Sequence, residues 1–262
     1  MTSISLSRRD FNVLEKIKDP ESNPTAAVLI DTTLPKDPNL MDTSVYDRVS
    51  QRERDIVLAI QQLEMQLASV RSTSTEPIQE YRQCLSKLGE LIEEYPKYAS
   101  ARNNRAQVIR RLYGDTLLLS GEQASSGLVT NVDELEKSRA AELALSDLDH
   151  AISLLTPKSM FAAISPQAGK TLSLAHTQRA AIYHMTSKFF QSNSKVNIIG
   201  RREGIWTKDD FEEAASREFA LGGRYGNEIA KALAVSTNPT AKLCGQMVRE
   251  AMKKEYGPAY SS

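Results

Sequence analysis

Five polar side chains near the middle of the chain have the chemistry needed to hold another polypeptide. They are Asn103, Asn104, Gln107, Arg110 and Arg111. An amide side chain both donates and accepts hydrogen bonds, so it can pair with an extended peptide backbone, and a guanidinium can grip a carboxylate through two parallel bonds. Their spacing places them on one side of a helix. The alternative is that the asparagines only satisfy neighbouring helix ends and that the arginines form a solvated edge.

A second polar set follows at 177–184, where the equivalent positions are Thr177, Gln178, Ala181 and His184. We expect Gln178 and His184 to extend the same binding face, because small Ala180 takes the place that Ala106 has in the first set. The predicted protein-binding groove therefore consists of Asn103, Asn104, Gln107, Arg110, Arg111, Gln178 and His184.

Signals for catalysis or cofactor binding are weak. The segment from Ala168 to Thr171 resembles the end of a phosphate-binding loop, but Ile164 stands where the first glycine should be and no buried strand precedes it. The histidines at 150, 176 and 184 have no Cys or Asp partners at ligand spacing. The sequence predicts no catalytic residue, no cofactor and no metal.

The polar residues sit in an amphipathic helix pair between Tyr98 and Pro157. The first half has one apolar face at helical spacing, made of Ala99, Ala106, Ile109 and Leu112. The second half has another, made of Leu143, Ala144, Leu148, Ala151, Ile152 and Leu155. Two such faces bury each other when the helices pair antiparallel.

The second half also carries the signature of the second helix of a tetratricopeptide repeat, in which small residues allow close helix approach and a proline follows the end. A single pair cannot bury its faces, so copies should flank it. They occur around Leu88 and Phe211. The copies are farther apart than the roughly 34 residues of a bare repeat. Each repeat therefore carries an insertion, and we expect these at 116–136, 157–169 and 191–205 to form surface loops.

The predicted fold class is all-α, an α-solenoid of about three tetratricopeptide-like helix hairpins with a C-terminal capping helix. The predicted organisation is a polar leader over 1–49 with a short helix capped by Asp10, repeats at about 50–96, 97–157 and 170–221, a capping helix over 239–256 and a tail over 257–262.

Charge and cysteine usage narrow the classes of partner. The chain has 33 basic and 33 acidic residues, so no overall field attracts it to nucleic acid or to an anionic membrane. We expect Cys84 and Cys244 to be buried, reduced thiols of an intracellular protein. The sequence has no signal peptide and no stretch of about 18 apolar residues. These features predict a protein of the cytosol, or of cytosol and nucleus, with a protein partner and no small-molecule substrate.

Several segments, taken in order, resemble the tetratricopeptide repeat protein 36 family. They are VLEKIKDPESNP, ASARNNRAQ with RLYGD, LSDLDHAISL, QRAAI, DDFEEAA and NPTAKLCGQMVREAM. The long insertions depart from the compact family pattern and look like a fungal-type elaboration. The resemblance implies a small three-repeat solenoid without catalytic activity, acting as a binding adaptor and linked with chaperone binding of the Hsp70 type.

Repeats that grip the C-terminal carboxylate of cytosolic chaperones use Lys and Asn, then Asn, then Lys and Arg in three successive first helices. In this chain Asn104 matches the middle Asn, but Leu174 and Gln178 stand at the third set and Glu53 and Val57 at the first. We therefore expect a chaperone to be contacted through a folded domain or an internal segment. The alternative function is a structural subunit that packs through its C-terminal helix.

Overall fold

The computed structural model describes residues 28–69, 76–121, 127–159, 162–191, 194–198 and 200–256. Its helices, in chain order, are α2 (Thr43–Ser69), α3 (Glu76–Glu94), α4 (Ala99–Tyr113), α5 (Glu134–Leu155), α6 (Pro166–Phe189), the 3-10 helix η1 (Arg202–Ile205), α7 (Lys208–Arg224), α8 (Glu228–Thr237) and α9 (Pro239–Tyr256). The predicted leader helix and the tail lie outside the described residues.

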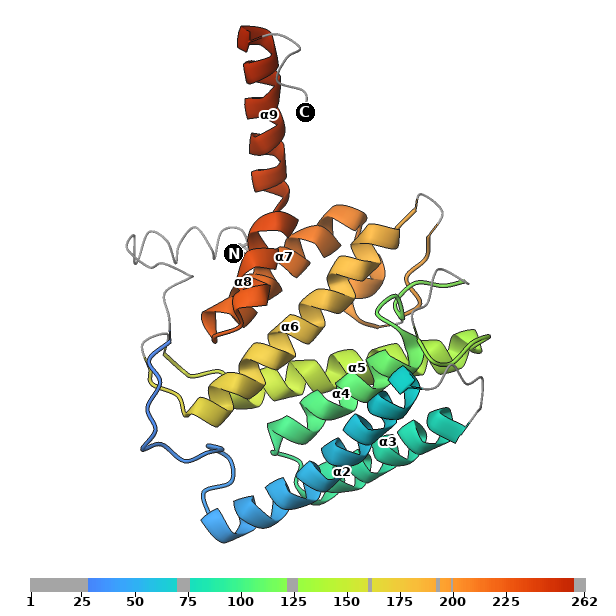
Figure 1. Ribbon diagram of the computed structural model, residues 1–262, viewed down its shortest axis with the longest axis vertical. Coiled ribbons are helices and arrows are strands. Elements are labelled where there is room, and N and C mark those ends of the chain that lie inside the picture. The colour runs from blue at the N-terminus through green and yellow to red at the C-terminus, as the bar shows by residue number, and fades with distance from the viewer. Residues whose placement is uncertain are drawn as a thin grey trace, which may run out of the picture.

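The helices pack mainly in chain order, each α-helix against the next, and α4 also contacts α6 (Figure 1). Within the described residues the only β-type pairings are two isolated bridges, Ile30 with Ile164 and Leu119 with Val196. The all-helical class predicted from the sequence is therefore confirmed.

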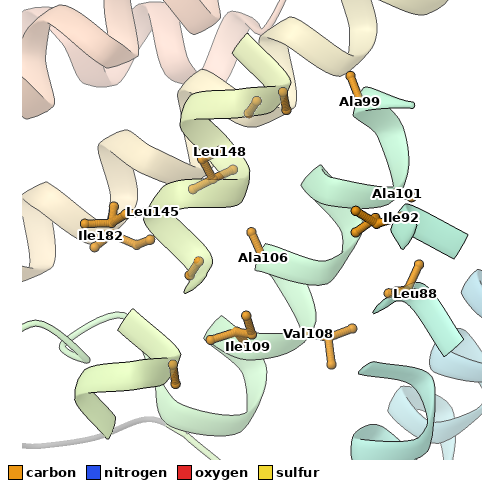
Figure 2. Packing of buried hydrophobic residues seen from close by; sticks show 14 of the residues in the cluster. Leu88, Ile92, Ala99, Ala101, Ala106, Val108, Ile109, Leu145, Leu148 and Ile182 are labelled. Atoms are coloured by element: carbon orange, nitrogen blue, oxygen red, sulfur yellow. The ribbon is translucent and has the colours of Figure 1, made fainter. Parts of the chain in front are cut away.

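Helix α4 lies at the centre of the core. Its predicted apolar face is confirmed, since Ala99, Ala106, Ile109 and Leu112 are all at most 1% exposed. Figure 2 shows Val108 on the side of α4 that meets α3, while Leu145 of α5 lies beside Ile182 of α6.

The face of α5 is predicted correctly except at its start. Ala144, Leu148, Ala151 and Leu155 are buried, but Leu143 is 37% exposed and lies on the outer side of the helix. The buried position belongs instead to Leu145.

Side-chain caps fix where the later helices begin. The carboxylate of Asp133 accepts from the backbone N–H groups of Leu135 and Glu136 at the start of α5. Ser165 caps α6 ahead of Pro166, and Thr207 forms a reciprocal capping box with Asp210 at the start of α7. These bonds satisfy amide donors that a helix leaves unpaired at its first turn.

The predicted boundary between leader and body at 49 and 50 is wrong. Helix α2 begins at Thr43, and the chain before it is tied to the body. Asp31 N donates to Ile164 O at 2.9 Å, Ile164 N donates to Leu29 O at 3.0 Å, and Asn39 Nδ2 donates to Leu154 O at 3.1 Å. The residues from Val28 onward therefore belong to the folded unit.

Two of the insertions join each other and are not independent surface loops. Ser120 N donates to Lys195 O at 3.0 Å, and Asn197 N donates to Leu118 O at 2.8 Å. Leu117 and Leu118 are fully buried beneath this contact. The insertion between α4 and α5 and the one between α6 and α7 thus add to the core.

The helix that covers the third hairpin is α8, not the predicted capping helix over 239–256. Ala230 of α8 is fully buried against Ala180 of α6 and Phe219 of α7. Gly226, with φ at 105°, lets the chain turn back immediately after α7, and Asn227 then caps α8. Helix α9 forms over the predicted residues, but it extends away from the rest of the molecule (Figure 1). Consequently Cys244 is exposed, contrary to expectation, whereas Cys84 is buried.

Gly222 marks the closest approach of α6, α7 and α8. A Cβ there would lie 2.5 Å from Thr177 Oγ1 and 3.2 Å from Ala230 Cβ. The Thr177 hydroxyl donates to Ser173 O and accepts from Asn227 Nδ2, so it is not free to move away.

We expect Gly222→Ala to lower the free energy of unfolding by about 1–3 kcal/mol, because the crowding outweighs the gain in helix propensity. Urea denaturation followed by circular dichroism measures it. The matched control is Gly245→Ala in α9, where an added Cβ meets no atom within 4 Å and stability should be unchanged or slightly higher. Equal midpoints for Gly222→Ala and the unmodified protein would contradict the packing described.

Candidate binding groove

A cavity of about 900 Å³ lies among α2, α4 and α6, the alternate helices of the array. Its lining includes five of the seven predicted site residues, namely Asn104, Gln107, Arg110, Arg111 and Gln178. The structure therefore brings these side chains to one surface, as their spacing predicts.

A second cavity of about 420 Å³ continues this surface toward the start of α2. The two share Val57, Asn104 and Leu174 in their linings. We call the surface that lines both cavities the groove. It follows the three helices α2, α4 and α6.

Asn103 and Gln178 join two of these helices. Gln178 Nε2 donates to Asn103 Oδ1 at 2.8 Å and to Asn103 O at 3.1 Å. Both residues are buried, at 2% and 7% exposed. They are thus engaged with each other, and Asn103 satisfies a neighbouring helix, which is the alternative that the sequence left open for it.

His184 does not line the groove. Its ring packs edge-on against Phe219 of α7, with centroids 6.2 Å apart. Six residues separate His184 from Gln178, and at about 100° per residue this places the two on different sides of α6. The prediction that His184 belongs to the binding face is wrong.

Arg111 is already paired with a carboxylate of the chain itself. Its Nε and Nη2 donate to Glu64 of α2 at 2.7 and 3.0 Å, and Tyr81 Oη donates to the same carboxylate at 2.6 Å. Burial acts to raise the pKa of Glu64, but the bonds from Arg111 and Tyr81 outweigh it and lower that pKa. The same contacts raise the pKa of Arg111, so this pair stays ionised.

Arg110 is occupied in the same way. Its Nε and Nη2 donate to the carboxylate of Asp115 at 2.6 and 3.0 Å, and its Nη1 donates to Gln178 Oε1 at 3.1 Å. The two guanidiniums were predicted to grip a partner carboxylate, but each is held by one from this chain. An anionic ligand would have to displace these bonds first, so these two arginines give the groove little preference for negative charge.

Glu53 adds a carboxylate at the other end of the groove. It is 7% exposed and accepts from Tyr98 Oη at 2.5 Å and from Asn104 Nδ2 at 2.7 Å. Burial raises its pKa, despite the hydrogen bonds that favour the charged form. The C-terminal carboxylate of a bound partner would lie close to the Glu53 carboxylate, which offers it no positive charge.

The five positions aligned with a carboxylate-binding set all line the groove, as the alignment predicts. They are Glu53, Val57, Asn104, Leu174 and Gln178. The location thus matches, but the side chains are a carboxylate, two aliphatic groups and two amides. This composition suits an uncharged segment better than a terminal carboxylate.

Apolar side chains line much of the remaining groove. Val57, Ile60 and Met65 come from α2, Val108 from α4 and Leu174 from α6. Leu174 is 40% exposed and lines three cavities of this side of the molecule. Exposed amides of Gln61 and Gln107 stand beside this apolar lining. Of the α2 residues in this lining, the sequence alignment identified Val57 but not Ile60, Gln61 or Met65.

The described residues provide neither a metal site nor a membrane-spanning helix. Within the described residues, no three His, Cys, Asp or Glu side chains lie close enough together to bind a metal ion. None of the described helices combines the length and apolarity that crossing a bilayer requires.

Comparison with known proteins gives three relatives. A protein of Aspergillus fumigatus named L-tyrosine degradation gene cluster protein hmgX is 34% identical over 96% of this chain and 93% of its own length. Tetratricopeptide repeat protein 36 of Danio rerio is 28% identical over 97% of both chains. A homologue of that protein in Drosophila melanogaster is 26% identical over 51% of this chain and 76% of its own length. No family model and no solved structure matches the chain.

Proposed function

Because this chain belongs to the tetratricopeptide repeat protein 36 family, we propose that it is a non-enzymatic adaptor, an α-solenoid of three helix hairpins that holds a partner protein in its groove. The observation that carries the proposal is the groove itself, where Asn104, Gln107 and Arg111 of α4 meet residues of α2 and α6 around one cavity. Alternate helices that share a concave face are how helical repeat arrays bind polypeptides.

The side chains of the groove define the kind of segment it takes. Apolar groups at Val57, Ile60 and Leu174 remove apolar surface of the partner from water, at about 25 cal/mol per Å². The amides of Gln61 and Gln107 pair with its backbone. The arginines are neutralised by Glu64 and Asp115, so the segment is apolar and uncharged.

We infer that the partner is an enzyme of L-tyrosine degradation. A relative that matches nearly the whole chain is named for a gene cluster of that pathway. An adaptor without catalytic groups contributes to a pathway by binding one of its enzymes. An Hsp70-type chaperone, which the family resemblance suggested, is the second candidate partner, held through an internal segment.

Isothermal titration calorimetry with each purified enzyme of L-tyrosine degradation tests the proposal. We expect one of them to bind saturably. The double change Gln61→Ala with Gln107→Ala should weaken that binding roughly tenfold, because each lost hydrogen bond is worth about 0.5–1.5 kcal/mol. The matched control is Gln246→Ala, an exposed amide of α9 outside the groove. If the unmodified protein, the double variant and the Gln246→Ala control bound with equal affinity, the groove would not be the binding site.

Salt dependence tests whether the groove takes an uncharged segment. Because Arg110 and Arg111 are already paired with carboxylates, raising the ionic strength should change the affinity for an enzyme by less than about threefold. A peptide with the free C-terminal carboxylate of an Hsp70-type chaperone should bind no better than the same peptide with a C-terminal amide. A strong preference for the free acid would contradict the assignment of the groove to uncharged segments.

A further inference from the structure

Helix α9 has almost no support from the rest of the protein. It contacts α8 and, near its start, α7, and then extends clear of the body (Figure 1). Every other described helix buries a face in the array. A helix of this length without tertiary packing is marginal in water, since most helical stability in proteins comes from a packed face.

An apolar face runs along this helix and is open to solvent. Its members recur at helical spacing and are Leu243, Cys244, Met247, Val248, Ala251 and Met252. Leu243, Met247 and Val248 are 56%, 61% and 57% exposed. Contiguous apolar surface of this kind marks an interaction site, whereas single exposed apolar residues do not.

Most of the charged residues of α9 are basic. By sequence the helix carries Lys242, Arg249, Lys253 and Lys254 against Glu250 and Glu255. Four positive charges against two negative ones favour an acidic partner surface. Two copies of this chain paired through α9 would bring two basic helices together, so the charges disfavour self-association.

We propose that α9 docks as a helix into an apolar groove, rimmed by carboxylates, on a partner protein. Leu243 and Met247 insert as anchors one helical turn apart, and Val248 and Met252 form a second such pair beside them, in the manner of an amphipathic helix in a groove. The unbranched Met side chains adapt to the shape of the pocket. Arg249, Lys253 and Lys254 pair with the acidic rim. This surface is separate from the groove of α2, α4 and α6, and the adaptor therefore has two points of contact.

Site-specific photocrosslinking of the full-length chain in its own cells tests the proposal. The crosslinking amino acid p-benzoylphenylalanine replaces Met247 in one variant and, in the matched control, Gln246, which lies about 100° further around α9 and outside its apolar face. We expect an adduct with a different protein from position 247, at least roughly tenfold stronger than from 246. Mass spectrometry of the adduct should place the crosslinked partner residue among apolar side chains flanked by Asp or Glu.

Three further variants make the outcome decisive. Leu243→Asp should abolish the adduct, and Lys253→Glu with Lys254→Glu should reduce it roughly tenfold, as expected for two charges at an interface rim. Leu174→Glu should leave it unchanged, because that residue belongs to the groove. An adduct between two copies of this chain, flotation of the purified protein on phosphatidylserine vesicles, equal crosslinking from 246 and 247, or no adduct at all would overturn the proposal.

Discussion

Replacing Leu174 by glutamate is expected to weaken binding of the partner by roughly 100-fold or more while the protein stays folded. Leu174 lies where the cavities of the groove meet, and it is the apolar residue that α6 contributes to the largest of them. A central, desolvated anchor typically contributes 2 kcal/mol or more to binding, and a buried unpaired charge adds a further penalty. The measurement is the dissociation constant from isothermal titration calorimetry.

The change should not disturb folding, because Leu174 is 40% exposed in the free protein. Leu143→Glu is the matched control, since Leu143 is a leucine of similar exposure on the outer side of α5. It should bind the partner with unchanged affinity. If both variants lost binding equally, the effect would be one of surface charge and the groove would not be the site.

Replacing Glu218 by glutamine is expected to cost about 1.5–3 kcal/mol of stability, because the buried guanidinium of Arg179 loses one of its two carboxylate partners and keeps only Asp149. Glu218 of α7 is 4% exposed, and its Oε2 accepts from Arg179 Nη2 and from His176 Nδ1, both at 2.7 Å. These bonds join α6 to α7. Urea denaturation at neutral pH measures the loss, and Glu213→Gln, an exposed position of the same helix, should show none.

The same carboxylate predicts how stability responds to acid. Burial alone would raise the pKa of Glu218, but the hydrogen bond from His176 and the charge of Arg179 outweigh it and hold the pKa at about 2. Because this is below the ordinary value of 4.5, the contribution is complete above about pH 4.5 and is lost as the pH falls toward 2. Glu218→Gln should therefore remove part of the acid dependence of unfolding. An identical pH profile for variant and parent would contradict the ionised pair.

Local periodicity accounts for what the sequence predicted well. The buried positions Ala106, Ile109 and Leu148 follow from a 3.6-residue repeat, which depends only on the helix itself. The same repeat places Asn104 and Gln107 on a common side of α4. Both features are set within one helix, and no distant part of the chain is needed to derive them.

Features that depend on distant parts of the chain were not predictable in this way. The partner of Arg111 is Glu64, 47 positions away, and nothing local indicates that the two meet. The misassignment of the capping helix has a similar cause: the turn at Gly226 decides that α8 and not α9 covers α7. The error at His184 has a different cause, because the rotation of about 100° per residue along a helix already places it on another side of α6 from Gln178.

An environment-sensitive dye in the groove tests the central claim most directly. Acrylodan is attached to a cysteine at Gln107 in a chain whose Cys84 and Cys244 are replaced by serine, and the partner enzyme is titrated in. The account predicts a saturable blue shift, because an apolar segment covers the dye, and no shift from the same dye at Leu143. A shift from position 143 together with a silent position 107 would contradict it.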